Sequence, residues 1–191
     1  RWSGNLKKLK VSGSNIIDSV GNIAINENGL IDEDARTFWL PTDQPADGNL
    51  VAEGGVNLLL STLDPDSRDV YTDKAGSITK FKASTPDEVL NLIPANVLGL
   101  TVDDINWARG VDVDNEDGDN SSIDQRSDTF GDPLHSKPVS IDYGDGNIRI
   151  LVGTNAGFLH MFKDKGESIE EEWAFIPSSL FKNIKPLRAN Q

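Results

Sequence analysis

Hydrophobic and polar positions alternate over short stretches of this chain, a pattern typical of β-strands that are covered on one face. In the first 60 residues we therefore expect strands broken by turns, and Asn28-Gly29 is a typical hairpin dipeptide. The run Val56–Leu60, which follows Gly54-Gly55, predicts a buried strand. The apolar positions expected on the earlier strands are Leu6, Leu9, Val11, Ile16, Ile17, Val20, Ile23 and Ile25.

Residues 68–109 predict a strand pair followed by helices. Asp69–Thr72 and Ser77–Phe81 have strand character and are joined by a loop of hairpin length. After residue 85 the apolar spacing becomes helical, and the pairs Thr85/Glu88 and Thr101/Asp104 have the spacing of capping boxes. We therefore expect two short helices in a helical insertion at about 85–109.

The last third of the chain predicts consecutive antiparallel strands, which are most of one propeller blade. The strands are expected at Ile148–Val152, Phe158–Phe162 and Trp173–Ile176, linked by short glycine-containing turns. The predicted fold class is mainly β, a partial β-propeller with quinoprotein-like antiparallel blades and a short helical insertion. The predicted domain organisation is 1–110 for the start of the propeller domain, 111–132 for an acidic loop and 133–191 for a propeller blade.

Composition narrows the function classes. The net charge of −13 disfavours binding to nucleic-acid phosphates. Cysteine is absent and there are only two histidines, which excludes thiolate chemistry and multi-histidine metal centres. No apolar run is long enough to span a membrane, and no signal segment stands at the start. Because residue 1 is Arg, we expect a processed product or part of a longer protein.

The acidic loop carries the clearest candidate chemistry. Residues 112–124 contain six acidic and no basic side chains, and converging carboxylates can bind Ca²⁺ through six to eight oxygen atoms. An EF-hand does not fit, because Asp117 and Ile123 stand where that loop requires Gly and Glu. A solvated loop without a metal remains the alternative. The candidate Ca²⁺ ligands are Asp112, Asp114, Asp117, Asp119 and Asp124.

Two groups resemble catalytic residues but fit structural roles better. His135 has Asp132 and Ser136 nearby, yet sequence neighbours rarely have triad geometry and no Gly-x-Ser-x-Gly motif is present. We expect His135 and Asp132 to fix the start of the blade by hydrogen bonds. His160 is expected to be a structural histidine on a strand, with its hydrogen bonds satisfied and its side chain facing away from Leu159 and Met161. The sequence predicts neither catalytic nor cofactor-binding residues, hence no enzyme.

Two further expectations concern turns and tryptophans. Asp142 and Asp145 are expected to stabilise a turn, and residues 153–157 to form a hairpin turn rather than a phosphate loop. Trp173 is expected to pack between blades. The tryptophans expected in the core are Trp2, Trp39 and Trp107.

An ordered set of motifs carries a family resemblance. The segments 131–139 (GDPLHSKPV), 152–162 (VGTNAGFLHMF) and 173–177 (WAFIP) follow one another with Tyr143-Gly144 between the first two. Their order and spacing resemble the start of the propeller in type IV pilus tip-associated adhesins of the PilY type. Upstream matches in the same order are 1–8 (RWSGNLKK), 53–55 (EGG), Arg68, 71–72 (YT) and 107–110 (WARG).

The resemblance implies an exported bacterial protein at the pilus tip or outer cell surface. It implies action by binding in pilus biogenesis, surface attachment and twitching motility. The partners would be minor pilins, the pilus tip complex and a host or abiotic surface. In this family Ca²⁺ tunes pilus extension against retraction, but the segment 142–147 (DYGDGN) has fewer carboxylates than the calcium loop that the family carries in a later blade.

Two other functions also fit the sequence. The first is a fragment of a quinoprotein-type dehydrogenase propeller, whose blades have a glycine followed closely by tryptophan. Here residues 168–172 lengthen the gap between Gly166 and Trp173, so that likeness is architectural. The second is a Ca²⁺-binding extracellular module with no connection to pili.

Overall fold

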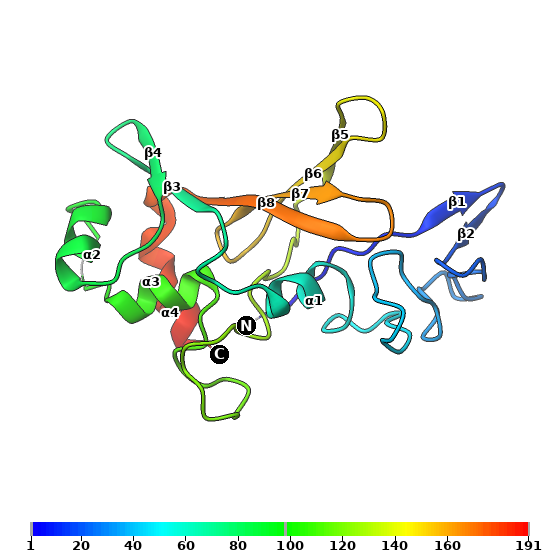
Figure 1. The fold of residues 1–191 in the computed structure, drawn as a ribbon, viewed down its shortest axis with the longest axis horizontal. Helices are drawn as coiled ribbons and strands as arrows, with labels where there is room; N and C mark the ends of the chain where they lie inside the picture. Colours follow the sequence, from blue (N-terminus) through cyan, green and yellow to red (C-terminus); the bar gives the residue numbers. More distant parts are fainter. Residues whose placement is uncertain (1, 98, 191) are drawn as a thin grey trace.

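A computed structural model describes residues 2–97 and 99–190 of the chain (Figure 1). One six-stranded sheet dominates the fold, with helices below it and a separate two-stranded hairpin near the N-terminus. The strands are β1 (Lys10–Ser12), β2 (Asn15–Ile17), β3 (Val70–Lys74), β4 (Ser77–Lys80), β5 (Val139–Asp142), β6 (Ile148–Gly153), β7 (Leu159–Asp164) and β8 (Ile169–Ile176). The helices are α1 (Gly55–Thr62), α2 (Pro86–Leu92), α3 (Val102–Arg109), the 3₁₀ helix η1 (Ser178–Asn183) and α4 (Ile184–Ala189).

The large sheet has the strand order β4-β3-β8-β7-β6-β5. Strands β5 to β8 form an antiparallel meander, in the region where the sequence predicts a blade. The β3–β4 hairpin joins this meander because β3 runs parallel to β8, with Val70 opposite Ala174. The mainly β prediction is therefore confirmed, whereas the parallel contact was not predicted. Residues 70–80 and 139–176 consequently share one sheet.

Helix α1 corrects the prediction of a buried strand at Val56–Leu60. Gly54 and Gly55 have φ of 62° and 56°, a conformation that turns the chain into the helix and that glycine adopts without strain. Val56 and Leu60 are four residues apart and lie on the same helical face, where both are buried. A short apolar run fits a strand and a buried helix equally well, and here the helix is correct.

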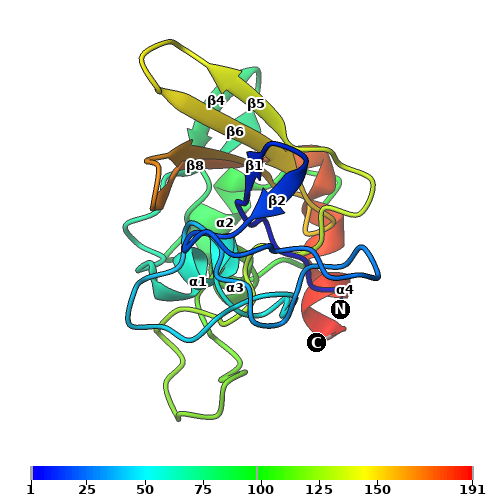
Figure 2. The same ribbon diagram turned by 90° about the vertical axis from the view of Figure 1, so that its right-hand side faces the viewer.

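Helices α2 and α3 confirm the two predicted short helices. The Thr85 hydroxyl accepts a hydrogen bond from the Glu88 amide at 3.2 Å, and α3 has a complete capping box between Thr101 and Asp104. Gly110 ends α3 with φ of 107°, a left-handed conformation that favours glycine. Figure 2 shows these helices on the side of the sheet opposite the β5–β6 turn.

The first 54 residues form few regular strands. β1 and β2 pair, but Ile23 and Ile25 take part only in isolated bridges, so the further strand expected there is not formed. Side chains hold this region instead. Lys7 Nζ donates to three backbone carbonyls within residues 47–50, and Asn5 Nδ2 donates to three carbonyls within residues 51–54. These bonds give hydrogen-bond partners to loop carbonyls that are not paired with a neighbouring strand.

The core lies between the sheet and the helices. One cluster is built around Phe81 and Phe181, and a second around Phe130 and Phe162. The core prediction is confirmed for two tryptophans, since Trp39 and Trp107 are buried. It is wrong for Trp2, which is 66% exposed.

Candidate functional site

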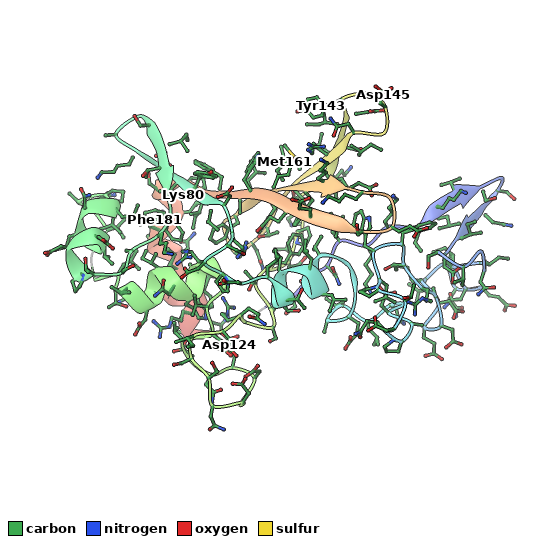
Figure 3. The ribbon with its side chains drawn as sticks, viewed as in Figure 1. Lys80, Asp124, Tyr143, Asp145, Met161 and Phe181 are labelled. Carbon is green, nitrogen blue, oxygen red and sulfur yellow. The ribbon has the colours of Figure 1, made fainter. Side chains whose placement is uncertain are left out.

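The acidic loop projects from the helical side of the molecule and carries Asp124, far from the turn that carries Tyr143 and Asp145 (Figure 3). Two backbone hydrogen bonds of 2.8 Å close its base, from the Asp112 amide to the Asp124 carbonyl and from the Arg126 amide to the Gly110 carbonyl. The loop therefore leaves the fold after α3 and returns to it at the segment that leads to β5. Both ends are fixed.

Two of the five predicted calcium ligands are used within the protein. Asp112 is fully buried, and its carboxylate accepts the amides of Glu116 at 2.8 Å and Asp117 at 3.4 Å. It therefore shapes the loop as a turn residue. Asp114 forms an ion pair with Arg188 of α4, with bonds of 2.6 and 2.8 Å. This pair raises the pKa of the Arg188 guanidinium.

The structure brings the other three predicted ligands together. One carboxylate oxygen from each of Asp117, Asp119 and Asp124 lies within 4.8 Å of the others. Asp124 Oδ1 is buried and has no hydrogen-bond partner. The Asp117 and Asp119 carboxylates also accept backbone amides at 3.1 and 2.6 Å. Three carboxylates can supply about half of the oxygen ligands of Ca²⁺, and waters would supply the rest.

The Asp142–Asn147 turn lies apart from this cluster. Asp142 Oδ1 accepts the Gly144 amide at 2.8 Å, and Asp145 has φ of 53° inside the turn. The turn role predicted for Asp142 and Asp145 is confirmed.

An apolar groove lies on the face of the large sheet that points away from the helices. Its volume is about 460 Å³. Leu159, Phe175 and Tyr71 are direct partners on adjacent strands, so their side chains share this face. Ile78 at its edge is 65% exposed. The side chains that line the groove are Tyr71, Ile78, Leu159, Trp173 and Phe175.

The charged side chains close to the groove are paired with one another. Lys80 forms an ion pair with Asp69 and lies over the Tyr71 ring, 4.5 Å from its centroid. Glu172, which precedes Trp173 in β8, pairs with Arg149 of β6. The groove is therefore apolar with a neutralised border, although the chain as a whole is strongly acidic.

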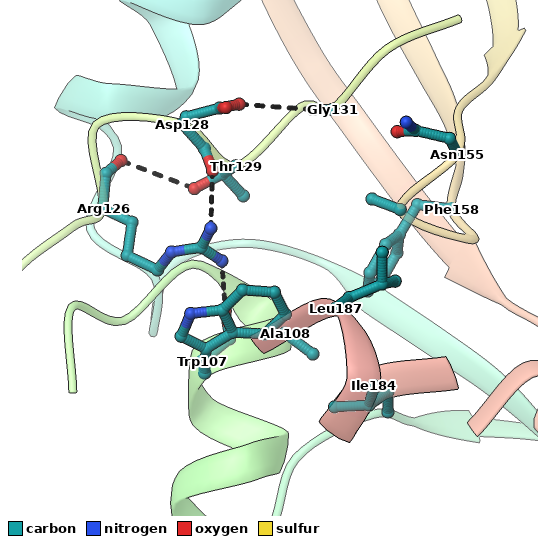
Figure 4. Close-up of a pocket in the computed structure, with 11 residues that line it drawn as sticks. Trp107, Ala108, Arg126, Asp128, Thr129, Gly131, Asn155, Phe158, Ile184 and Leu187 are labelled. Atoms are coloured by element: carbon teal, nitrogen blue, oxygen red, sulfur yellow. Dashed lines mark hydrogen bonds between the residues drawn. The ribbon is translucent and has the colours of Figure 1, made fainter. Parts of the chain in front are cut away.

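A small internal cavity of about 20 Å³ lies between α3, α4 and the turns at 126–131 and 155–158 (Figure 4). Trp107, Phe158 and Leu187 supply much of its apolar lining. The Arg126 guanidinium lies over the Trp107 ring at 3.9 Å and donates to the Trp107 carbonyl at 2.9 Å. A cavity of this size holds about one water molecule, so it is a packing gap rather than a substrate site.

A buried charged network connects β7, β8 and the segment before β3. The Glu171 carboxylate receives two bonds from Arg68, at 2.6 and 2.8 Å, and lies 2.9 Å from His160 Nδ1. Arg68 also donates to the Arg109 carbonyl at the end of α3. Burial acts to raise the pKa of Glu171, but the Arg68 charge and the hydrogen bonds outweigh it and lower the pKa to about 2.

Sequence reasoning missed the roles of Glu171 and Arg68 in this network. The sequence does contain one signal of this network, an acidic residue at a strand position whose side chain faces the core. Within the acidic run 170–172, Glu171 lies opposite Phe162, whose side chain is fully buried. A buried carboxylate requires a charged or hydrogen-bonding partner, but the sequence does not show that the partner is Arg68.

His160 faces away from Leu159 and Met161, as predicted, and lies on the inner face of β7. It is 1% exposed and stacks on Phe162 with a centroid distance of 5.6 Å. Its Nδ1 atom is paired with Glu171, but its Nε2 atom is buried without a hydrogen-bond partner, so the prediction of a satisfied histidine is wrong for Nε2. Burial lowers the pKa of the imidazole below its ordinary value.

The structure gives Asp132 and Ser136 structural partners. Asp132 Oδ1 accepts the Leu134 amide at 2.8 Å, and Ser136 Oγ accepts the Gly153 amide at 3.2 Å. The hydrogen-bonding role predicted for Asp132, in the segment before β5, is confirmed. His135 is exposed and joins none of these bonds, so the same prediction is wrong for His135.

Comparisons with protein-family models, curated proteins and solved structures find no match for this chain. Across residues 2–97 and 99–190, no helix has both the length and the apolar character that crossing a membrane requires.

Proposed function

We propose that this chain is part of a type IV pilus tip-associated adhesin of the PilY type and acts by binding, not catalysis. The observation that carries the proposal is the β5–β8 meander of four antiparallel strands, together with the open apolar groove where β7 and β8 meet the β3–β4 hairpin. A propeller blade needs an open apolar face, because neighbouring blades pack against it. On this proposal the groove at Trp173 is the contact for an adjacent blade.

The positions of the motif segments support the resemblance. The Gly4 amide donates to the Gly131 carbonyl at 3.0 Å, and the Asn155 side chain accepts the Asp132 amide at 2.8 Å. A β-carbon on Gly4 would lie 2.5 Å from the Pro133 ring, so only glycine fits there. Motif segments that are far apart in the sequence thus contact one another, as expected if together they build one framework.

The proposed mechanism is rigid display at the cell exterior. The paired sheet and two apolar clusters fix the relative positions of the loops, so that partners meet a preformed surface. Minor pilins and the pilus tip complex are the proposed assembly partners. A host or abiotic surface is the proposed target of attachment.

Binding of the purified chain to purified minor pilins, measured by biolayer interferometry, tests the proposal. We expect saturable binding that persists in an Ile123→Ser control, whose side chain is 85% exposed outside the groove. If none of the minor pilins binds the chain, the proposal is contradicted. Stoichiometric uptake of pyrroloquinoline quinone would favour the quinoprotein dehydrogenase instead.

The carboxylate cluster favours a second candidate function, a Ca²⁺-binding extracellular module. Calorimetric titration with CaCl₂ should give heat of binding in the wild type and none in Asp117→Asn/Asp124→Asn. The matched control is Asp142→Asn/Asp145→Asn, which removes the same number of charges in the distant turn and should bind as the wild type does. No heat in the wild type would exclude the calcium site. Calcium binding without pilin binding would favour this second function.

A further inference from the structure

We propose that His160 is an acid-sensitive latch, meaning a side chain whose protonation weakens contacts that hold two segments to the sheet. The contacts are those of segment Thr129–Gly131 with β7 and of Arg68 with β8. The inference is independent of the pilus assignment, because it depends only on the packing of one side chain. The latch is closed while the imidazole is neutral and opens when Nε2 takes a proton from solvent.

The packing and hydrogen bonding of the neutral His160 ring define the closed state of the latch. His160 is 1% exposed and its ring lies among three phenylalanine rings, with centroid distances of 5.3 Å to Phe130, 5.9 Å to Phe158 and 5.6 Å to Phe162. An ionised carboxylate only accepts hydrogen bonds, so Nδ1 carries the proton in the 2.9 Å contact with Glu171. Nε2 is then an acceptor atom without a partner, which is tolerated among aromatic rings far better than an added charge.

Protonation disturbs this arrangement in two ways. It creates a second N–H donor, at Nε2, where no acceptor is present. It also places a second cation beside the carboxylate that Arg68 already neutralises. The charged groups that face the imidazole are Glu171 from β8 and Arg68 from the segment before β3. β6 and the segment before β5 contribute the apolar side chains of Val152 and Phe130.

Release of the imidazole would affect contacts beyond β7. Phe130 packs on the ring and stands at the end of the segment that follows the acidic loop. Arg68 connects Glu171 to the carbonyl of Arg109 at the end of α3, where that loop begins. Both ends of the loop are thus linked to the charge state of His160.

The sign of the effect follows from linkage. Burial places the folded-state pKa of His160 below its unfolded value, so the unfolded chain binds the proton more strongly. Stability is therefore fully present above the unfolded pKa of about 6.5 and falls as the pH decreases below it. A folded pKa one unit lower increases the unfolding constant by up to tenfold.

The experiment compares pH 7.5 with pH 5.0, where histidine is the side chain that normally titrates. The imidazole pKa of His160 is measured by NMR, and hydrogen exchange follows the amides of residues 128–132. We expect a pKa below 6.5 and several-fold faster exchange at pH 5.0, after correction for the intrinsic exchange rate. A pKa at or above 6.5, or corrected exchange that does not change with pH, would overturn the latch.

Variants separate the latch from general acid effects. His160→Phe keeps a ring in the aromatic cluster but cannot titrate, so its exchange should lose the acid response. His135→Asn removes the exposed histidine and should respond as the wild type does. An acid response that persists in His160→Phe, or that His135→Asn abolishes, contradicts the proposal. Should His160→Phe fail to fold, the wild-type NMR titration still decides.

Discussion

The two faces of the large sheet differ in what covers them. The inner face packs on helices and loops, and it holds even charged groups such as Glu171 and Arg68 out of water. The outer face has apolar side chains of similar size, among them Trp173 and Phe175, but no described segment covers the groove between them. The sequence pattern alone cannot distinguish these faces, because both are apolar. The difference indicates that the inner face stabilises this chain and the outer face is available to a neighbour.

The largest effect is expected from breaking the buried ion pair on the inner face. Glu171→Ala leaves the Arg68 charge buried and unpaired, which should lower the free energy of unfolding by about 3–5 kcal/mol. The matched control is Glu170→Ala, because this neighbouring carboxylate is exposed and forms its salt bridge with exposed Lys165. Its effect should stay within about 0.5 kcal/mol. Urea unfolding measures both, and equal losses would show that the faces do not differ in this way.

A second matched pair uses isoleucines on opposite faces. Ile176 is 1% exposed and Ile78 is 65% exposed. Ile176→Ala should cost about 2–5 kcal/mol, because it leaves a cavity in the core. Ile78→Ala should cost less than about 1 kcal/mol, because its side chain is already largely in water. A large loss in Ile78→Ala would mean that the outer face is covered in solution.

Acid should weaken the inner face before the outer one. The pKa of Glu171 is lowered to about 2 from 4.5, so its contribution is present above pH 4.5 and lost as the pH falls toward 2. Between pH 5 and pH 2.5 the loss from Glu171 should be about 2 kcal/mol in the wild type. Denaturant unfolding at pH 5 and pH 2.5 checks this. Glu170→Gln should show the same dependence, and a wild type with constant stability would contradict the assignment.

The last effect is expected at the groove, on dye binding as well as on stability. Because Trp173 is partly buried, Trp173→Ser should lower the free energy of unfolding by about 1–3 kcal/mol, and it should also lower binding of the dye ANS to the folded chain. Fluorescence titration measures the dye. His135→Ser serves as an exposed control off the sheet and should leave dye binding unchanged. Unchanged dye binding in Trp173→Ser would show that the groove is not an accessible apolar surface.

The sequence predicts the strands of the β5–β8 meander well because their alternation is local. It fails where the outcome depends on distant partners. Val56–Leu60 has the length of a strand, and the positive φ of Gly54 and Gly55 turns it into a helix. The parallel contact of β3 with β8 joins residues about 100 positions apart, which no local pattern can encode.

The candidate site shows the same limit. Spacing identified the acidic loop, and three of its five predicted ligands do converge. The other two predicted ligands bind partners within the protein that the sequence pattern does not show. Asp114 meets Arg188, which is 74 residues away, and Asp112 satisfies backbone amides inside the loop. Which carboxylates stay available is decided by tertiary contacts.

The closed base of the acidic loop separates its tip from the remainder of the molecule. Backbone hydrogen bonds at 110–126 and 112–124 determine where the loop leaves and rejoins the fold, and the residues between Gly118 and Ser122 lie outside the strands and helices. Changes of length or sequence at this tip would leave the sheet register intact. Related chains could therefore diversify this surface independently of the scaffold, much as antibodies vary loops on a constant framework.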